Sequence, residues 1–509
     1  MQPLKAMGRL FGLGGAPSPA AARVEPQVGG HSEPPSGRRR GFKMAGGGRL
    51  ATAWSGRTSG ADADQLIFAD HETLRQRARE QSINTSYLKR FYRLLRQNVI
   101  GPYGIRLQSK AVLPDGKADR ITRRLIEKEW RKFCKKGVFD VTGRYSYVTF
   151  SWLWLDTLAR DGEVLVRLVR NWPNRWGFAL QIVEADRLDL HLNELLDNGN
   201  RIRMGVELDE WERPVAYWML RDHPGDILRR AEERYERIPA SELIHTFDPW
   251  RPHQSRGFTW THAAAVDIHH LGEFRSATLV KAEHGAKITG FYEQDAEWLD
   301  PPDEGEDVDV LEEVEAGTTK VLPYGLTYKP HQNASPGSDY APFVKDTLRG
   351  GAAGLGPSYN RLANDLEGVS YSSLRSGELD ERDFYKTCQE FVISELLERV
   401  GEEWFNCALL KGVIKIAPRD LARCSEMEWQ ARGWDWVDPL KDSKAASESI
   451  SNRTKSRSYY IRLNGDDPDE IFEEIEAEEQ LLREKGLLAD PNKPKAEEPA
   501  NAEELDSDE

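Results

Sequence analysis

The sequence predicts a multi-domain α+β protein that is mostly helical, and three observations lead to this prediction. The chain has 509 residues, enough for several domains that each have a hydrophobic core. Hydrophobic residues make up 39% and charged residues 30%, a balance typical of a soluble and partly globular protein. Segments with helical periodicity lie on either side of a central block whose apolar residues alternate as in strands.

Charge is distributed unevenly along the chain. Residues 466–509 hold 18 Asp and Glu against four Lys and Arg, so this tail carries the entire net charge of −14. Residues 1–60 are rich in Gly, Pro and Ser, and they carry nine basic against two acidic residues. We expect both ends to be disordered, a basic arm (1–60) and a solvated acidic tail (466–509). The arm, with Arg38–Arg40 and Lys43, suits non-specific contact with DNA or with an acidic partner.

Neither the start of the chain nor its cysteines indicate an exported protein. The first residues lack the apolar stretch of a secretory signal, and Met44 offers a later translation start. The four cysteines form no CxxC pair, which favours a reducing cytoplasm over a disulfide scaffold. No apolar run approaches 18 residues, so the sequence predicts no transmembrane helix.

The first elements are helices. Apolar residues spaced by three and four predict a helix over 64–97, which should stop near Gly101-Pro102. A basic helix is expected over 120–136 and an aromatic-rich helix around 145–158. The arginines and lysines of 88–97 are read as the solvated face of an amphipathic helix in preference to a nucleic-acid contact.

A β-rich block follows. Five segments alternate or run apolar and predict strands, with a hairpin turn at 209–214: 163–169, 178–183, 201–208, 215–220 and 244–247.

Helices dominate the second half of the chain. A helix should run from after Gly257 to about Lys287, and another over 341–354. Between them, residues 288–319 contain 12 acidic and no basic residues, followed by a strand at 324–328. A polar connection leads to a long amphipathic helix from about Tyr371, with a break expected at Gly401 before residues 404–410.

The patterns that carry catalysis or bind cofactors were sought and none is convincing. The run Gly350–Gly356 follows a helical pattern and lacks the Lys-Ser/Thr of a phosphate-binding loop, so close helix packing explains it better. Five of the 11 histidines lie within residues 245–270, but no pair has the spacing of helical metal ligands. We therefore expect no enzyme, no metal and no cofactor, with the histidines solvated or satisfied in the core.

Several segments together resemble the portal proteins of lambda-type tailed phages. In chain order these are Asn98–Gln108, Val183–Leu188, Arg213–Trp218 with His223-Pro224, Ile238–Phe247, Trp250–Gly257, Leu348–Gly356 and Val369–Arg375. The resemblance covers roughly residues 64–465 and leaves out both ends. Each segment is weak alone, but their order makes the resemblance specific.

The resemblance implies a portal fold with a β-rich wing, a two-helix stem, an inserted clip, a tunnel loop and a C-terminal helical crown. On this sequence the expected parts are a wing (61–256), stem helices (257–287 and 341–356), a clip with an acidic insertion (288–340), a tunnel loop (357–370), a long wing helix region (371–425) and a crown (426–465).

The implied function is that of a portal subunit in the virion, assembled in the host cytoplasm. About 12 copies would form a homo-oligomeric ring at one capsid vertex, through which double-stranded DNA is packaged and ejected. The expected partners are the terminase large subunit, head-completion and tail-connector proteins, and capsid and scaffold proteins, with no membrane. The alternatives are a cytoplasmic scaffold or adaptor, and a DNA-packaging accessory enzyme without a channel.

Charge balance suits a conduit. The chain before residue 466 has 66 acidic and 66 basic residues, and a near-neutral body avoids clamping the densely charged duplex. Sparse polar groups would steady the DNA backbone; the candidates are Asn360, Arg361 and Asn364 in the tunnel loop and Lys281, Lys345 and Arg349 on the stem helices. For the stem residues, ion pairs between subunits are an equal alternative.

Overall fold

A computed structural model describes residues 61–227, 235–287, 290–294, 326–330, 337–434 and 438–487. All of them belong to one compact unit, Arg40–Glu509, whereas the second unit, Met1–Arg39, lies outside the described residues. The predicted basic arm also lies outside them, as do residues 295–325, which hold most of the predicted acidic insertion. The four cysteines are free thiols. None of the described helices is long and apolar enough to cross a membrane.

The N-terminal segment forms two helices where the sequence predicted one. Helix α1 (Ala63–Asn84) starts at Asp62, whose carboxylate accepts a hydrogen bond from the Gln65 amide. Thr85 is extended and ends it, and α2 (Ser86–Leu95) continues into a π-helical turn at Arg96–Ile100. The β-branched Thr85 weakens the helix locally, a signal that the apolar spacing does not carry.

Two further helices confirm the prediction for this part of the chain. Helix α3 (Arg120–Phe133) begins at an Asp119 cap, and α4 (Tyr147–Asp161) begins at a capping box between Ser146 and Thr149. Helix α4 is buried along most of its length and contacts strand β2.

Strand β2 (Glu163–Arg170) forms the centre of a three-stranded antiparallel sheet with β3 (Phe178–Val183) and β9 (Leu243–Phe247). Its side chains alternate between two cores. Val164, Val166 and Leu168 join the main core with α2, α4, α8 and α9, whereas Leu165 joins the core of the second sheet. Burial on both faces explains why this strand is almost continuously apolar.

The second sheet has five strands in the order β4-β5-β6-β7-β8. Its strands are β4 (Glu194–Leu195), β5 (Arg201–Arg203), β6 (Val206–Leu208), β7 (Pro214–Leu220) and β8 (Tyr235–Pro239). The pairing of β6 with β7 confirms the predicted hairpin across 209–214. The single strand predicted over 201–208 was wrong, because Met204 and Gly205 adopt positive φ and turn the chain between β5 and β6.

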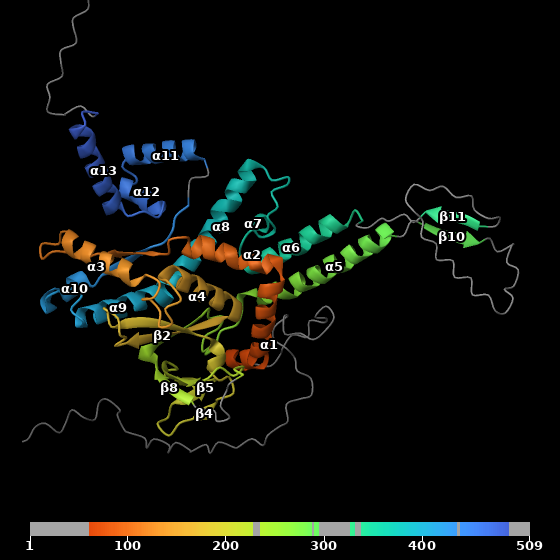
Figure 1. Ribbon diagram of the computed structural model, residues 1–509, viewed down its shortest axis with the longest axis horizontal. Coiled ribbons are helices and arrows are strands. Elements are labelled where there is room, and N and C mark those ends of the chain that lie inside the picture. The colour runs from red at the N-terminus through yellow and green to blue at the C-terminus, as the bar shows by residue number, and fades with distance from the viewer. Residues whose placement is uncertain are drawn as a thin grey trace, which may run out of the picture. The chain divides into compact units, whose positions relative to one another are not determined.

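Two helices pair with each other in the middle of the chain. Helix α5 (Ala265–Lys287) packs against α6 (Tyr340–Leu355) in opposite directions, since Ile268 approaches Gly351 and Phe274 contacts Phe343. Figure 1 shows these two helices side by side. The short strands β10 (Gly290–Gln294) and β11 (Leu326–Pro330) pair with each other within the segment that joins them.

The C-terminal half is helical. Helix α7 (Tyr359–Ala363) lies in the connection predicted to be polar and irregular, and α8 (Tyr371–Val392) runs through a π turn at Ile393–Leu397 into α9 (Glu398–Leu410). The break expected at Gly401 was wrong. Gly401 lies inside α9, and a β-carbon there would meet the Trp429 ring at 2.7 Å, so packing explains this glycine.

The last elements tie the end of the chain to its beginning. Strand β1 (Arg106–Ser109) pairs with β12 (Met427–Gln430), after the short helix α10 (Leu421–Cys424).

Three helices follow β12: α11 (Pro439–Ser451), α12 (Arg457–Leu463) and α13 (Pro468–Glu484). Helix α13 corrects the prediction of disorder from residue 466, because Asp467 caps it and apolar residues recur along it; residues 488–509 lie outside the described part.

Candidate functional site

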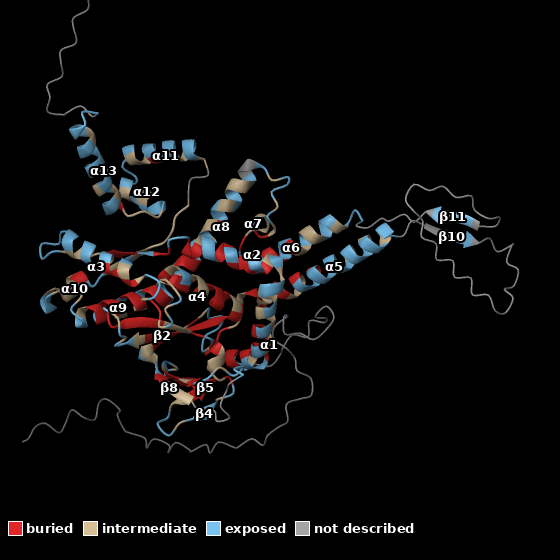
Figure 2. Ribbon diagram, viewed as in Figure 1, coloured by how far each residue is buried: buried red, intermediate tan, exposed pale blue. Residues whose placement is uncertain are grey.

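The paired helices α5 and α6 expose apolar side chains that nothing in the described chain covers. From here on this helix pair is called the arm, and it is distinct from the basic arm predicted at residues 1–60. Only Ala265, Ile268 and Leu271 are buried among the 23 residues of α5. Farther along, Leu279 is 71% exposed, and Val280 and Phe343 are half exposed. Figure 2 shows exposed residues along most of α5, in contrast to the buried core around α4 and β2. Such a surface is a candidate for contact with another protein surface.

The glycine-rich run on α6 serves helix packing. A β-carbon on Gly351 would lie 3.4 Å from Ile268, and one on Gly354 would lie 3.4 Å from Ala263. The run lies within a helix, as the sequence predicted, and its small residues let α6 approach α5 and the chain before it closely. This confirms the packing interpretation of the run over a phosphate-binding loop.

The structure gathers two of the six predicted contact residues around Tyr359 of α7. Lys345 and Arg349 lie over the Tyr359 ring, at 5.8 and 5.6 Å from its centroid. Lys345 also forms an ion pair of 3.1 Å with Asp365 of its own chain, and the Tyr359 hydroxyl donates to Asp365 at 2.7 Å. Hydrogen bonds to the Asp365 carboxylate lower its pKa to about 2, and the one from Tyr359 has the largest effect. Lys345 therefore has a partner within the subunit.

The residues predicted in the tunnel loop have local structural roles. Arg361 forms an ion pair with Glu378, and its carbonyl accepts a hydrogen bond from Arg90 at 3.2 Å. Asn364 is exposed and adopts a left-handed conformation (φ 55°) that ends α7. The carbonyl of Asn360 accepts hydrogen bonds from the amides that follow this turn.

Among the four basic candidates, Lys281 is the one for which the described residues give no ion pair, hydrogen bond or ring contact. It is exposed on α5, and it has no ion-pair or hydrogen-bond partner among the residues that the structure describes. Its positive charge is therefore available to a ligand or to another subunit.

The chain that enters the arm is fixed by a buried charged cluster, which the sequence analysis did not predict. Arg256 is 0% exposed and donates to Glu163 at 2.6 and 2.8 Å. It also donates to the carbonyls of Leu188 at 3.1 Å and Met204 at 2.8 Å. A guanidinium whose donors reach a carboxylate and backbone carbonyls is a satisfied buried charge, and here it joins both sheets to the start of the arm.

Two histidines and a second arginine complete the cluster around Glu163. His245 Nε2 lies 3.0 Å and His71 Nε2 lies 3.3 Å from the Glu163 carboxylate, and Arg75 donates to it at 2.5 Å. Burial alone would raise the pKa of Glu163, but Arg256 and the hydrogen-bonding histidines hold it well below its ordinary value. Burial, with the charge of Arg75, lowers the pKa of His71 to about 4, and burial also lowers that of His245. His245 is thus a histidine satisfied in the core, as the sequence predicted.

Two glycines allow the backbones to meet at this cluster. A β-carbon on Gly257 would lie 2.1 Å from the Gly162 carbonyl oxygen, and one on Gly162 would lie 2.1 Å from the Phe258 backbone. Gly162 also ends α4 in a left-handed conformation (φ 90°). Side chains at these positions would separate β2 from the segment that starts the arm.

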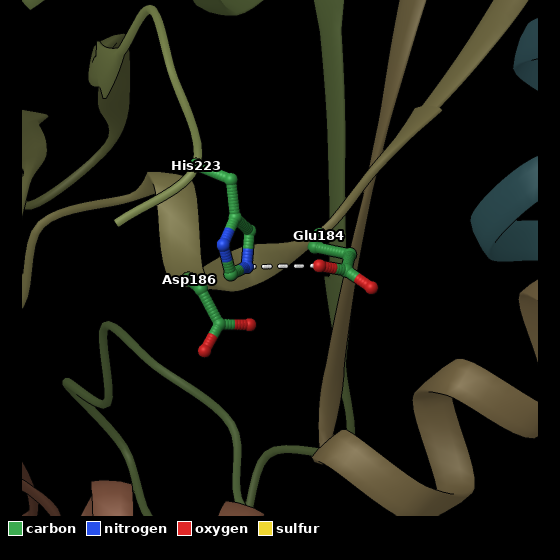
Figure 3. Close-up of side chains that lie close together, drawn as sticks. All are labelled: Glu184, Asp186 and His223. Atoms are coloured by element: carbon green, nitrogen blue, oxygen red, sulfur yellow. Dashed lines mark ion pairs between the residues drawn. The ribbon is translucent and has the colours of Figure 1, made fainter. Parts of the chain in front are cut away.

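One acidic group has the spacing of metal ligands, and Figure 3 shows its side chains. Among the described residues, Glu184, Asp186 and His223 bring their ligand atoms within 4.8 Å of one another. His223 forms an ion pair with Glu184 at 2.9 Å, and Asp186 pairs with Arg75 and Arg79. Two arginines already compensate Asp186, so one of the three possible ligands is engaged within the protein.

Comparison with known proteins gives a consistent result. The family model described as phage portal protein, lambda family, matches residues 47–389. The chain is 59% identical over 493 residues to a probable portal protein of Halomonas phage phiHAP-1, covering 95% of this chain and 93% of that protein. It is 22% identical over 405 residues to portal protein B of Escherichia phage lambda, covering 72% and 75%. The first relative extends beyond 64–465, into the ends that the sequence analysis left outside the resemblance.

Solved structures of gene transfer agent particles are also similar. The chain matches one from the neck of an empty particle with a TM-score of 0.46 and 15% identity, covering 82% of this chain and 95% of that one. A chain from the neck of a native particle, computed with C12 symmetry, has a TM-score of 0.43 and 12% identity, with coverage of 78% and 94%.

Proposed function

From the membership of this chain in the lambda family of phage portal proteins, we propose how its parts serve a portal. The protein is a portal subunit of the virion, and a portal is the structure through which double-stranded DNA is packaged and ejected. The observation that carries this function is the family match over 47–389 together with a portal relative that shares 59% of its residues. The alternative of an adaptor without a channel has no comparable support.

The arm is proposed to form contacts between neighbouring subunits of a ring of about 12 copies. Leu279, Val280 and Phe343 are apolar and at least half exposed in the single chain. Burying such side chains against a neighbour contributes roughly 1.5–3 kcal/mol for each one. A head-to-tail interface of this kind repeats from subunit to subunit and closes when its rotation divides the circle.

The parts predicted from the resemblance remain our proposal for the architecture. In this proposal α5 and α6 are the stem, the β10–β11 hairpin belongs to the clip, and α7 lies in the tunnel loop. The two sheets belong to the wing, α8 and α9 to the long wing helix region, and α11 and α12 to the crown. The pairing of α5 with α6 on either side of the hairpin supports the stem and clip.

Lys281 is the first candidate for DNA contact, because its charge is exposed and has no partner within the described chain. Arg361, Lys345 and Arg349 are secondary candidates, since each already contacts Glu378, Asp365 or Tyr359. Asn360 and Asn364 would contribute through their amide groups. A few such groups steady a sliding duplex without the strong retention that many phosphate contacts produce.

The remaining parts of the proposal concern partners and chemistry. The subunit is structural, and ATP hydrolysis is supplied by a terminase that docks on the ring. Tail-connector proteins replace the terminase after packaging, and capsid and scaffold proteins surround the ring during assembly in the host cytoplasm. Family membership supports these roles.

Electron microscopy of the purified protein tests the function. We expect a ring with a central hole wide enough for duplex DNA, and a particle mass of roughly 0.7 MDa for about 12 chains of 57.9 kDa. Mass photometry of the same sample gives the mass independently. Small or polydisperse particles without a hole would contradict the proposal and favour the adaptor.

A further inference from the structure

Helix α3 carries a stripe of positive charge that the portal function does not use. Residues 120–136 contain eight basic and two acidic residues. Four of the basic residues recur on α3 at a spacing of three or four and are exposed, which places them on one face: Arg120, Arg124, Lys128 and Arg131. Lys135 is also exposed and lies just beyond the end of the helix. These five residues are here called the basic stripe, which at 1.5 Å per residue runs about 16 Å along the helix from Arg120 to Arg131.

The acidic helix α13 lies against this stripe and against the neighbouring Arg123 of the same helix. Asp469 pairs with Arg123 at 3.2 Å, Glu470 pairs with Arg131 at 3.7 Å, and Glu473 pairs with Arg124. The two helices line opposite sides of a groove of about 780 Å³. The contact joins segments about 340 residues apart and matches opposite charges along both helices.

This contact is electrostatic and weakly held. Pro468 is the only buried residue of α13, and Phe472 and Ile475 remain 40% and 44% exposed. Ion pairs that are open to water contribute little stability each and weaken with salt. A more densely charged anion can therefore displace α13 without disrupting a hydrophobic core.

The basic stripe also has more positive charge than α13 neutralises. Arg120, Lys128 and Lys135 have no ion-pair partner among the described residues. Helix α13 carries eight acidic residues over 17, about one charge per 3 Å of helix. Duplex DNA carries about one charge per 1.7 Å of its axis, nearly twice that density.

We propose that the basic stripe of α3 binds the phosphate backbone of duplex DNA, and that α13 occupies the stripe as an internal competitor. The acidic helix then limits non-specific binding of the free subunit to DNA, and it releases the stripe where DNA is concentrated. This surface is separate from the arm and lies outside the residues predicted to contact DNA in the channel.

Removing the three paired acidic charges tests the proposal in the full chain. In the variant Asp469→Asn, Glu470→Gln, Glu473→Gln, we expect the affinity for a short duplex to rise at least about tenfold. The dependence of log affinity on log salt should steepen by about 0.9 for each additional phosphate contact, or close to 3. Fluorescence anisotropy with a labelled duplex between 50 and 200 mM salt measures both quantities.

A matched control is Glu474→Gln, Glu478→Gln, Glu484→Gln, which removes equal charge from α13 residues that have no ion pair with α3. It should bind DNA like the unmodified chain. Adding Arg124→Ala, Lys128→Ala, Arg131→Ala to the first variant should abolish the gain, while circular dichroism confirms that the helices persist.

Three results would overturn the proposal: no gain, an equal gain in the control, or a gain that survives the α3 substitutions. The proposal is also wrong if an acidic peptide of residues 466–487, and not DNA, binds the exposed stripe. The stripe would then serve a protein segment. None of these results would change the ring test, so the two proposals fail separately.

Discussion

At the residue scale, Arg256 and Lys281 show two opposite uses of a basic side chain. Arg256 is fully buried, and its charge is matched by Glu163 and backbone carbonyls. Its removal would leave Glu163 with fewer donors in a dry environment. Lys281 is exposed on the arm and leaves its charge available to a ligand. We therefore expect Arg256 to affect stability, and we propose Lys281 for binding.

The variant Arg256→Ala should lower the free energy of unfolding by about 3–5 kcal/mol, because it leaves a buried carboxylate with too few partners. Urea titration followed by tryptophan fluorescence measures the change. Arg213→Ala is the control, since Arg213 is 75% exposed and pairs with Asp209 on the surface, so its effect should stay near 0.5 kcal/mol. Equal decreases in the free energy of unfolding for the two substitutions would show that the buried Arg256–Glu163 pair stabilises the fold no more than the surface pair does.

Stability should fall as the pH drops from about 6.5 to 4. The pKa of His71 is lowered to about 4 in the folded chain, so in this range the unfolded chain binds a proton at His71 and the folded chain does not. A tenfold difference in proton affinity between the folded and unfolded chain corresponds to about 1.4 kcal/mol of stability. Glu163 adds a further loss of stability when the pH falls below the ordinary pKa of a glutamate. Its pKa is lowered in the folded chain, so the unfolded chain binds a proton there before the folded chain does.

Urea titrations at several pH values measure this loss, and His71→Gln should flatten the slope between pH 6.5 and 4. The control His269→Gln changes an exposed histidine and should leave the slope as it is. A slope that is the same in all three proteins would contradict the role of His71.

DNA retention tests the residues that we propose to contact DNA. Lys281→Ala should reduce the DNA content of assembled particles roughly twofold, because every copy in the ring loses an available charge. Arg361→Ala should have a smaller effect in the same direction, since Arg361 is paired with Glu378. Quantitative PCR on nuclease-treated particles measures the DNA, and electron microscopy confirms that the rings form. Normal DNA content in a variant would remove that residue from the list of contacts.

At the scale of elements, the arm is notable because it exposes apolar side chains to solvent in the single chain. The first turns of α5 are anchored at the Arg256 cluster and by Ile268 and Leu271. Beyond these turns α5 packs against α6 through pairs such as Phe274 and Phe343, and Arg275 donates to the Tyr87 hydroxyl of α2 at 3.0 Å. An antiparallel pair of helices with exposed apolar residues is stable when a neighbour covers it.

The variant Leu279→Asp should convert rings into single subunits or small oligomers, because burying an unpaired carboxylate at an interface costs several kcal/mol. Size-exclusion chromatography with light scattering measures the mass. Leu195→Asp is a matched control on β4, where the leucine is 72% exposed compared with 71% for Leu279. Intact rings of Leu279→Asp would move the subunit interface away from this face of α5.

At the scale of the whole molecule, charge separates the body from the tail. The chain up to residue 465 is neutral, with 66 acidic and 66 basic residues, and the tail carries a net charge of −14. A neutral body suits a duplex that must slide, since few counterions are released when it binds. The contact of α13 with the basic stripe places part of the tail charge against the body.

Much of this organisation could be predicted, because the signals are local. Helical spacing predicted α3, α4, α6 and α8, and alternation predicted β2, β3, β7 and β9 to within a few residues. The helix expected from just after Gly257 begins only at Ala265, because a 3-10 turn at Trp260–Ala263 precedes α5. The segments between Asn98 and Arg375 that resemble portal proteins, taken in their order along the chain, led to the portal family, which the comparisons confirm. The errors at Thr85, Met204–Gly205 and Gly401 arose where a single residue, and not a period, decides the local structure.

The sequence by itself determined the elements, the charge of the segments and the family, since each depends on residues that are near one another or occur in a fixed order. Only the tertiary structure decided which charges meet. Arg256 reaches Glu163 across 93 positions, and Arg123 reaches Asp469 across 346. Periodicity holds no information about such distant partners, because they come together only when helices and sheets pack. The buried cluster at the start of the arm and the covered basic stripe were therefore visible only in the folded chain.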